Sequence, residues 1–236
     1  MITLLQWNIQ DGGGGKQRKK LSLPLLTALT DRYKPDVIVL NESAAKIQQC
    51  PKATKRYNIS GYILHTPVLI RNHYLAVMTP DARSVGVTIN SDRIFVTLED
   101  VKIVALHHDC HKGVDKPARD IQFAMCDHKS GWIAIGDWNY GLDKIKREKG
   151  VNDPAEAKFS VVKVSRSEGT LTFSTGLSAT NRQTHRSGWI DGALTCGLDE
   201  TERIHFHSDD LRTLSGQIAS DHTPTLIRLE QRRPTP

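Results

Sequence analysis

The sequence predicts an α/β protein with mixed β-sheets and helices outside the sheets. Short runs rich in β-branched residues recur along most of the chain between turn-forming residues, which is typical of strands. In the middle of the chain short turns join these runs and indicate antiparallel pairing, whereas the flanks indicate strand–helix–strand units. The predicted strands are 2–7, 37–40, 61–65, 74–78, 84–89, 94–98, 101–106, 132–135, 189–195 and 224–229.

A helix is predicted between the first two strands. Ser22 can cap its amino end, and Pro24 is tolerated in the first helical turn. Pro35 ends the helix, because the residue before a proline is disfavoured in helical conformation. The apolar face consists of Leu25, Leu26, Leu29 and Tyr33. A second helix is expected to begin near Asp115.

Length and composition favour a single domain over 1–236, with 231–236 as a frayed tail. The chain has 236 residues, of which 38% are hydrophobic and 25% are charged, as in ordinary globular domains. No apolar run approaches the roughly 18 residues of a membrane-spanning helix. The amino end lacks the basic and small-residue pattern of a signal peptide. We therefore expect an intracellular (cytoplasmic or nuclear) protein without a membrane span, and a monomer.

The charge balance favours polyanionic partners. The formal net charge is +6, which suits nucleic acid or an anionic membrane surface. The four cysteines are widely spaced and form no Cys-x-x-Cys pair. In a chain of this length that pattern predicts reduced thiols rather than a disulfide framework.

Polar residues able to bind metal or transfer protons stand beside nearly every predicted strand. Because sites gather where strand ends and loops converge, these residues are expected to form one site. Each residue alone could be a helix cap or a turn residue. Asp191 is harder to explain that way, since a carboxylate inside an apolar strand is costly to bury unpaired. The set comprises Asn8, Asn41, Glu42, His107, His108, Asp137, Asn139, Asp191, Asp221 and His222.

The set and its order resemble the endonuclease/exonuclease/phosphatase superfamily, and most of all its abasic-site and non-LTR retrotransposon endonucleases. The resemblance implies a four-layer sandwich of two mixed, mostly antiparallel β-sheets flanked by helices. It places the site at the mouth between the sheets. The motifs are Trp7-Asn8-Ile9, Asp36-Val37-Ile38-Val39-Leu40-Asn41-Glu42, Ala105-Leu106-His107, Gly136-Asp137-Trp138-Asn139, Gly188-Trp189-Ile190-Asp191 and Ser220-Asp221-His222-Thr223-Pro224.

The resemblance implies a Mg²⁺ site, in which Mn²⁺ can substitute. Glu42 would be the principal ligand, with Asn8 and Asp221 as ligands or as residues that hold the ligands. Mg²⁺ prefers oxygen ligands and keeps several waters, so few carboxylates suffice. Gln10 stands where many nuclease members carry an acid, which leaves the number of metals open. The alternative is a zinc cluster, whose spacing is too crowded for all members to converge: His107, His108, Cys110 and His111.

The resemblance also assigns catalytic roles. Asp137 would orient or deprotonate the attacking water, and Asn139 would donate to phosphate oxygens. His222 would contact the scissile phosphate, while Asp191 fixes its tautomer and stabilises its charged form. His107 would support the phosphate or the leaving oxygen. Metal and imidazolium would together neutralise the charge that develops on the phosphate.

Basic segments favour nucleic acid as the substrate. A glycine run at 12–15 precedes a cluster of cations, whose charges and backbone amides could follow a phosphate backbone. The resulting hypothesis is a metal-dependent hydrolase of phosphodiester bonds, an endonuclease with DNA favoured over RNA. The alternatives are an RNA-directed nuclease, a phospholipid or inositol-phosphate hydrolase, and a catalytically silent nucleic-acid-binding domain. The predicted substrate-binding residues are Lys16, Arg18, Lys19, Phe173, Thr175 and Arg186.

Overall fold

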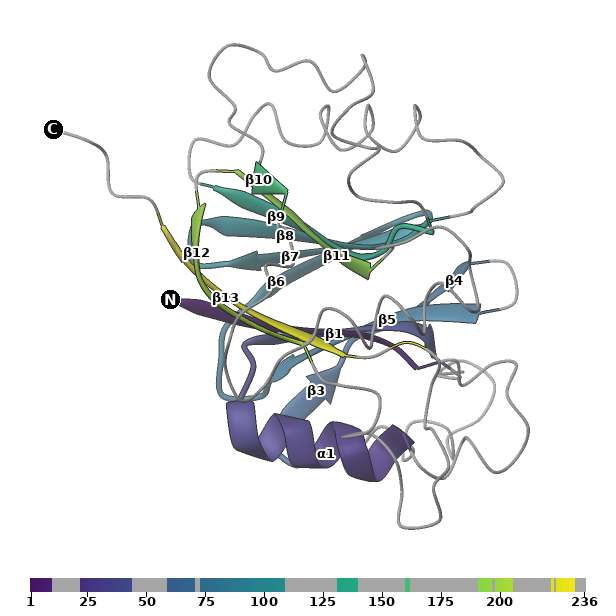
Figure 1. Ribbon diagram of the computed structural model, residues 1–236. Coiled ribbons are helices and arrows are strands. Elements are labelled where there is room, and N and C mark those ends of the chain that lie inside the picture. Colours follow the sequence, from purple (N-terminus) through teal and green to yellow (C-terminus); the bar gives the residue numbers. More distant parts are fainter. Residues whose placement is uncertain are drawn as a thin grey trace, which may run out of the picture.

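Two β-sheets stacked face to face form the centre of the molecule (Figure 1). The computed structural model describes residues 1–9, 22–43, 59–70, 73–108, 131–139, 160–161, 191–196, 198–205, 222 and 224–231. Sheet A has the order β12 (Leu198–His205), β13 (Thr225–Gln231), β1 (Ile2–Asn8), β2 (Val37–Ser43), β5 (His73–Pro80) and β3 (Tyr62–Leu64), and β4 (Val68–Ile70) also pairs with β5. Sheet B has the order β10 (Ser160–Val161), β11 (Asp191–Cys196), β9 (Trp132–Asp137), β8 (Val101–His107), β7 (Arg93–Leu98) and β6 (Gly86–Asn90).

A parallel pair lies inside each sheet, and the other described pairings are antiparallel. In sheet A the parallel pair is β1 with β2, and Asn8 is in register with Asn41. In sheet B it is β8 with β9, and His107 is in register with Asp137. Because parallel strands end at the same edge of a sheet, each pair brings its last polar residues side by side.

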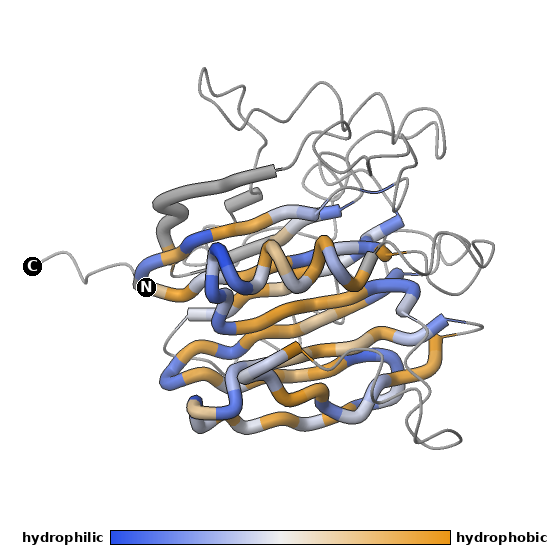
Figure 2. Tube along the Cα trace, turned by 90° about the horizontal axis from the view of Figure 1, so that it is seen from below, coloured by the Kyte–Doolittle hydropathy of each residue, from blue (hydrophilic) through white to orange (hydrophobic). Residues whose placement is uncertain are grey.

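Helix α1 (Ser22–Tyr33) covers the face of sheet A that is turned away from sheet B (Figures 1 and 2). Its buried Leu26 and Leu29 pack with the outward apolar residues of sheet A. The helix ends where Lys34, at φ +46°, donates its backbone N–H to the carbonyl of Thr30 at 2.8 Å. This left-handed cap satisfies a carbonyl of the last turn.

Side-chain alternation along the strands separates two apolar cores. On β1, Ile2 and Leu4 face sheet B, whereas Leu5 and Trp7 face α1. Successive residues of a strand point to opposite faces of the sheet, so one strand supplies both cores. The core between the sheets also takes its residues from β2, β4, β5, β7, β8, β9, β11, β12 and β13, and Figure 2 shows the hydrophobic colouring running along the middle of the strands.

An ion-pair cluster joins the two sheets at the end where β2 and β8 begin. Asp36, just before β2, accepts the backbone N–H of Thr3 at 2.7 Å and pairs with Arg83. Arg83 also donates to Glu99 at 2.8 Å, in the turn between β7 and β8. The guanidinium of Arg83 therefore ties the residue before β2 in sheet A to the turn between β7 and β8 in sheet B.

The predicted architecture of two mixed sheets with a helix outside is confirmed, as is the helix at 22–33. Each predicted strand overlaps an observed one. Three strands were not predicted, namely β4, β10 and β12. β4 and β10 are very short, and β12 carries too many charges to form an apolar run. The helix expected near Asp115 lies outside the described residues. Among those residues, no helix has the length and apolarity needed to cross a membrane.

Gly136→Ala should destabilise the fold strongly. Gly136 has φ +153°, and a Cβ there would lie 1.9 Å from the carbonyl oxygen of Leu106 on the neighbouring strand. We expect the free energy of unfolding, measured by urea titration, to fall by more than about 2 kcal/mol. Gly61→Ala is the matched control. Gly61 has φ +78° but no neighbour within 4 Å, so only the backbone cost of about 1–2 kcal/mol applies. Equal losses in the two variants would contradict the close approach of β8 and β9.

Candidate active site

The rows of side chains that face the space between the sheets turn from apolar to polar at one end. On β1, Leu4 is followed by Gln6 and Asn8 at alternate positions, all of them buried. On β9, Ile135 is followed by Asp137. β8 reaches His107 after Ala105, and β11 carries Asp191 two positions before Ala193. The strand period of two therefore aims all these polar groups into the same end of the sandwich.

The amide of Asn8 links the two sheets. Its Nδ2 donates to Glu42 Oε1 at 3.1 Å within sheet A and to Asp137 Oδ2 at 2.8 Å in sheet B. The other oxygen of Asp137 accepts the backbone N–H of Asn139 at 2.8 Å. Hydrogen bonds on both oxygens hold the Asp137 carboxylate in one orientation.

Glu42 reaches this cluster through a backbone irregularity. Ile38 and Leu40, at the same parity on β2, belong to the core under α1. The pairing of β2 with β5 shifts between Leu40 and Ser43, and Glu42 has φ +52°. A bulge of this kind redirects a side chain relative to the strand alternation. Asn139, at φ +49°, is a second non-glycine residue of the site in the left-handed region, where backbone strain is found at functional sites.

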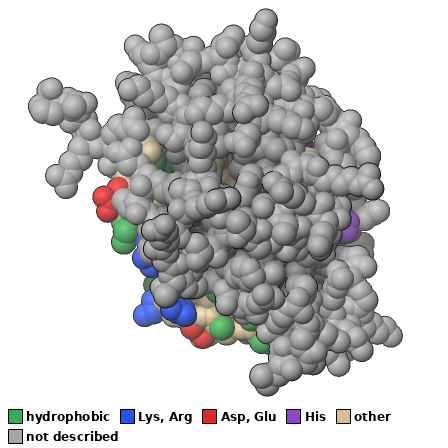
Figure 3. All heavy atoms as spheres, viewed as in Figure 1, with side chains coloured by type: hydrophobic (Ala, Val, Ile, Leu, Met, Phe, Trp, Pro, Cys, Tyr) green, Lys and Arg blue, Asp and Glu red, His purple; other side chains and the backbone are tan. Residues whose placement is uncertain are grey.

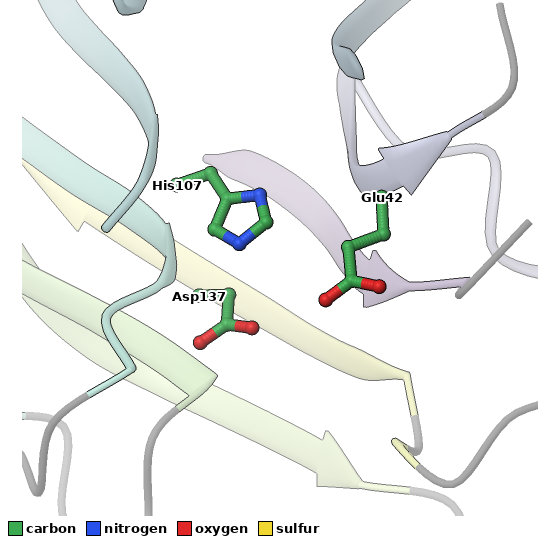
Figure 4. Close-up of side chains that lie close together, drawn as sticks. All are labelled: Glu42, His107 and Asp137. Atoms are coloured by element: carbon green, nitrogen blue, oxygen red, sulfur yellow. The ribbon is translucent and has the colours of Figure 1, made fainter. Parts of the chain in front are cut away.

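Glu42, His107 and Asp137 form a cluster suited to a divalent cation. One ligand atom from each lies within 4.8 Å of the other two, and Figure 4 shows the two carboxylates and the imidazole ring turned toward the same space. Two carboxylates provide the oxygen ligands that hard cations prefer, so the residues fit such an ion. Burial lowers the pKa of His107, which favours its neutral ring. His73, on β5, has its Nδ1 at 4.0 Å from Glu42 Oε2.

A buried carboxylate–imidazole pair lies beside this cluster. Asp191 Oδ2 and His222 Nδ1 are 2.6 Å apart, with His222 fully buried. The backbone carbonyl of His222 accepts the indole N–H of Trp7 at 3.0 Å, and the carbonyl of Gly192 accepts that of Trp138 at 3.1 Å. The two indoles thus hold the segments that carry the pair. Ligand atoms of Asp137, Asp191 and His222 also lie within 4.8 Å of one another.

Asp137 is held in an environment that favours its protonated form. Burial raises the pKa of its carboxyl to about 7, and the nearby negative charge of Asp191 adds to this. His222 and the hydrogen bonds from Asn139 and Asn8 act in the opposite direction. A carboxylate whose pKa lies near neutrality can accept a proton from water more readily than an ordinary one.

Seven of the predicted site residues lie together at this end of the sandwich: Asn8, Glu42, His107, Asp137, Asn139, Asp191 and His222. Seven others lie outside the described residues: Asp221, Lys16, Arg18, Lys19, Phe173, Thr175 and Arg186. Of the proposed zinc ligands, Cys110 and His111 also lie outside them, and His108 accepts the Asn139 amide with its carbonyl at 2.7 Å. On the face in Figure 3, the described residues show basic, acidic and apolar side chains in small groups.

The sequence reasoning missed Gln6 and His73, which lies next to Glu42. It included Asn41 and the two tryptophans in its motifs but gave them no role in holding the site together. Strand alternation would have revealed Gln6, which stands two residues before Asn8 on the same face of β1. The sequence carries no such signal for His73, because its closeness to Glu42 results from the pairing of β2 with β5.

The pKa of Asp137 predicts how the stability of the metal-free protein depends on pH. The folded state holds this proton up to about pH 7, whereas the unfolded chain releases it near 3.8. The proton on Asp137 therefore stabilises the folded state fully below about pH 4, and this stabilisation is lost as the pH rises through 7. With a chelator present, the unfolding free energy should fall by on the order of 1–4 kcal/mol across this interval relative to Asp137→Asn. The exposed Asp92→Asn variant should keep the wild-type slope; a wild-type slope in Asp137→Asn would contradict the prediction.

Comparison with known proteins identifies the fold. No protein-family model and no curated protein sequence matches the chain. Solved structures do match, among them TDP2 of D. rerio complexed with a single-strand DNA product (13% identity, TM-score 0.66, covering 98% of this chain and 99% of that one), a 3′-5′ exonuclease of Neisseria meningitidis (13%, 0.62, 97% and 100%) and an endonuclease/exonuclease/phosphatase of Bacteroides vulgatus (14%, 0.61, 98% and 99%). At these identities the likeness concerns the fold, and at that level it confirms the resemblance carried by the six ordered motifs. The chain has the endonuclease/exonuclease/phosphatase fold.

Proposed function

We propose that this chain is a divalent-metal-dependent phosphodiesterase that hydrolyses nucleic acid, with Mg²⁺ as the metal and DNA as the favoured substrate. The observation that carries the proposal is the amide bridge of Asn8 between Glu42 and Asp137, next to the buried Asp191–His222 pair. The same end of the sandwich therefore holds a carboxylate for a cation in Glu42, a proton acceptor in Asp137 and an oriented imidazole in His222.

Glu42 is the residue that would be the principal ligand of the cation, and Asn8, which donates to Glu42 and to Asp137, would keep both carboxylates in place beside it. A bound Mg²⁺ ion would supply Lewis-acid stabilisation of the charge that develops on the phosphate. Neutral His107 closes the same space and can hydrogen-bond to a phosphate oxygen or to the leaving oxygen. Asp221 belongs to the proposal because the motifs imply it as a further ligand or as a residue that holds the ligands.

Asp137 is the proposed acceptor of the proton from the attacking water. In the metal-free protein burial raises the pKa of this carboxyl to about 7, which makes it a better proton acceptor than an ordinary carboxylate. His222 donates its Nδ1–H to Asp191, which fixes the ring tautomer, and its proposed role is to contact the scissile phosphate. Asn139 uses its Nδ2 on the carbonyl of His108; because an amide nitrogen carries two N–H groups, a second donor remains for a phosphate oxygen.

Nucleic acid is the substrate class that charge and fold favour together. The net charge is +6, which suits a polyanion. Of the solved structures with this fold, TDP2 of D. rerio is complexed with single-strand DNA, and the protein of N. meningitidis is a 3′-5′ exonuclease. The cationic segment from Lys16 to Lys20 follows β1, whose last residue is Asn8.

A substrate panel tests the proposal. Purified protein is incubated with Mg²⁺ or with a chelator on supercoiled plasmid, single-stranded DNA, RNA, a duplex with an abasic site, and inositol phosphates. Metal-dependent cleavage of a DNA substrate is the expected result. Cleavage of RNA alone would move the assignment to a ribonuclease, and cleavage of inositol phosphates alone would reject nucleic acid. No turnover on any substrate would favour a silent binding domain.

Single substitutions in the site should remove most turnover and leave the fold intact. Glu42→Gln, Asp137→Asn and His222→Ala should each lower kcat by at least about 10²-fold, because each deletes a charge or a proton-transfer group. Glu99→Gln is a matched control for Glu42→Gln, since Glu99 also lies in the left-handed region, at φ +54°, but is exposed and paired with Arg83. Circular dichroism checks folding. A well-folded site variant with wild-type kcat would remove that residue from the mechanism.

The basic segment after β1 should govern the salt dependence of binding. Neutralising Lys16, Arg18, Lys19 and Lys20 should weaken DNA binding and reduce the slope of log K against log salt concentration by about 0.7–0.9 for each phosphate that the variant no longer neutralises. A control that neutralises Arg32, Lys34 and Lys102 should leave the slope unchanged. Fluorescence anisotropy across a salt series measures both. An identical slope in wild type and the first variant would show that the cations that bind phosphate lie elsewhere.

A further inference from the structure

Gln6 is a buried amide that joins the two halves of the site and has no role in the proposed chemistry. It is fully buried on β1, in the row that runs from Leu4 to Asn8 between the sheets. Its Nε2 lies 3.1 Å from Asn41 Oδ1 in sheet A and 3.0 Å from Asp191 Oδ1 in sheet B. A carboxylate can only accept hydrogen bonds, so the amide nitrogen is the atom that faces Asp191.

Both donors of the Gln6 amide are engaged by acceptors of the site. Both N–H groups of Nε2 have an acceptor, whereas the buried Oε1 has no partner among the described residues. An unpaired buried carbonyl is unfavourable, since it loses its bonds to water. The preceding positions of the row, Ile2 and Leu4, belong to the apolar core. Core packing alone would favour an apolar residue here, and polar exceptions of this kind are expected at functional sites.

The donors of Gln6 complete the surroundings of the Asp191 carboxylate. Oδ1 accepts from Gln6 and Oδ2 pairs with Nδ1 of His222 at 2.6 Å. A carboxylate with only the second bond could rotate about its Cβ–Cγ axis and carry the imidazole with it. With both oxygens engaged by groups on different elements, the plane of the carboxylate is determined.

Asn41 anchors Gln6 in turn. Its Oδ1 accepts from Gln6, and its Nδ2 donates to the backbone carbonyl of Leu106 at 2.8 Å. Leu106 immediately precedes His107 on β8. A continuous chain of hydrogen bonds therefore runs from the strand of His107, through Asn41, Gln6 and Asp191, to His222.

We propose that Gln6 is a positioning residue of this site, which sets the plane of the Asp191 carboxylate and through it the orientation of the His222 imidazole. The inference rests on the proposed function for its catalytic consequence. Its structural part, the control of the Asp191–His222 hydrogen bond by Gln6, holds for the metal-free protein without any substrate.

The test compares Gln6→Met with Leu4→Met. Methionine matches the unbranched length of glutamine and has no donor, and Leu4 lies in the same row of β1 with an apolar role. In metal-free wild-type protein, the Nδ1 proton of His222 should give a far-downfield NMR resonance, because its hydrogen bond is short and charge-assisted. Gln6→Met should shift or broaden this resonance, and Leu4→Met should leave it in place.

The kinetic arm uses whichever substrate the panel identifies. Gln6→Met should lower kcat about 10–100-fold, the range for residues that orient a functional group, with KM within about threefold of wild type. A resonance and kcat unchanged in folded Gln6→Met overturn the proposal. If Gln6→Met does not fold, wild type decides: slow exchange of the Gln6 side-chain amide protons supports the contact, and fast exchange overturns it. An inactive wild type would reject the proposed function, while the resonance still decides the role of Gln6.

Discussion

The amide row on β1 is the constraint on which the rest of the site depends. Gln6 and Asn8 stand two residues apart on one face of the strand, and each donates to one acceptor on β2 and one on sheet B. These bonds form only where the sheets approach within the reach of a single side chain. The apolar core therefore sets the spacing at which the polar end can assemble.

The two sheets provide that end in a similar way. Each contains a parallel strand pair with polar residues in register at its end, Asn8 with Asn41 and His107 with Asp137. Close strand packing in sheet B requires a glycine before Asp137, where a Cβ would meet the neighbouring backbone. On β2 a bulge turns Glu42 out of the alternation. Regular strands orient most of the candidate site residues, whereas an irregular backbone orients Glu42.

Much of the fold and of the site could be predicted from the sequence. The apolar runs located the central strands because buried strands must be apolar, and α1 followed from its apolar face, from Pro24 in its first turn and from Pro35 just beyond its end. Asp191 was indicated by its cost as a carboxylate in an apolar strand, and the structure places it against His222. The charged strand β12 could not be recognised, because its pairing with β13 is a property of the assembled sheet.

The sequence by itself determined which chemical groups are present and which strand ends carry them, because the alternation of apolar and polar residues is a local property of the chain. The tertiary structure decided which of these groups touch. That Gln6 bonds to Asp191, 185 positions away, and that burial beside Asp191 raises the pKa of Asp137 depend on the distance between two sheets. That distance is set by side-chain packing over the whole core, and residues from many separate segments of the chain contribute to this packing.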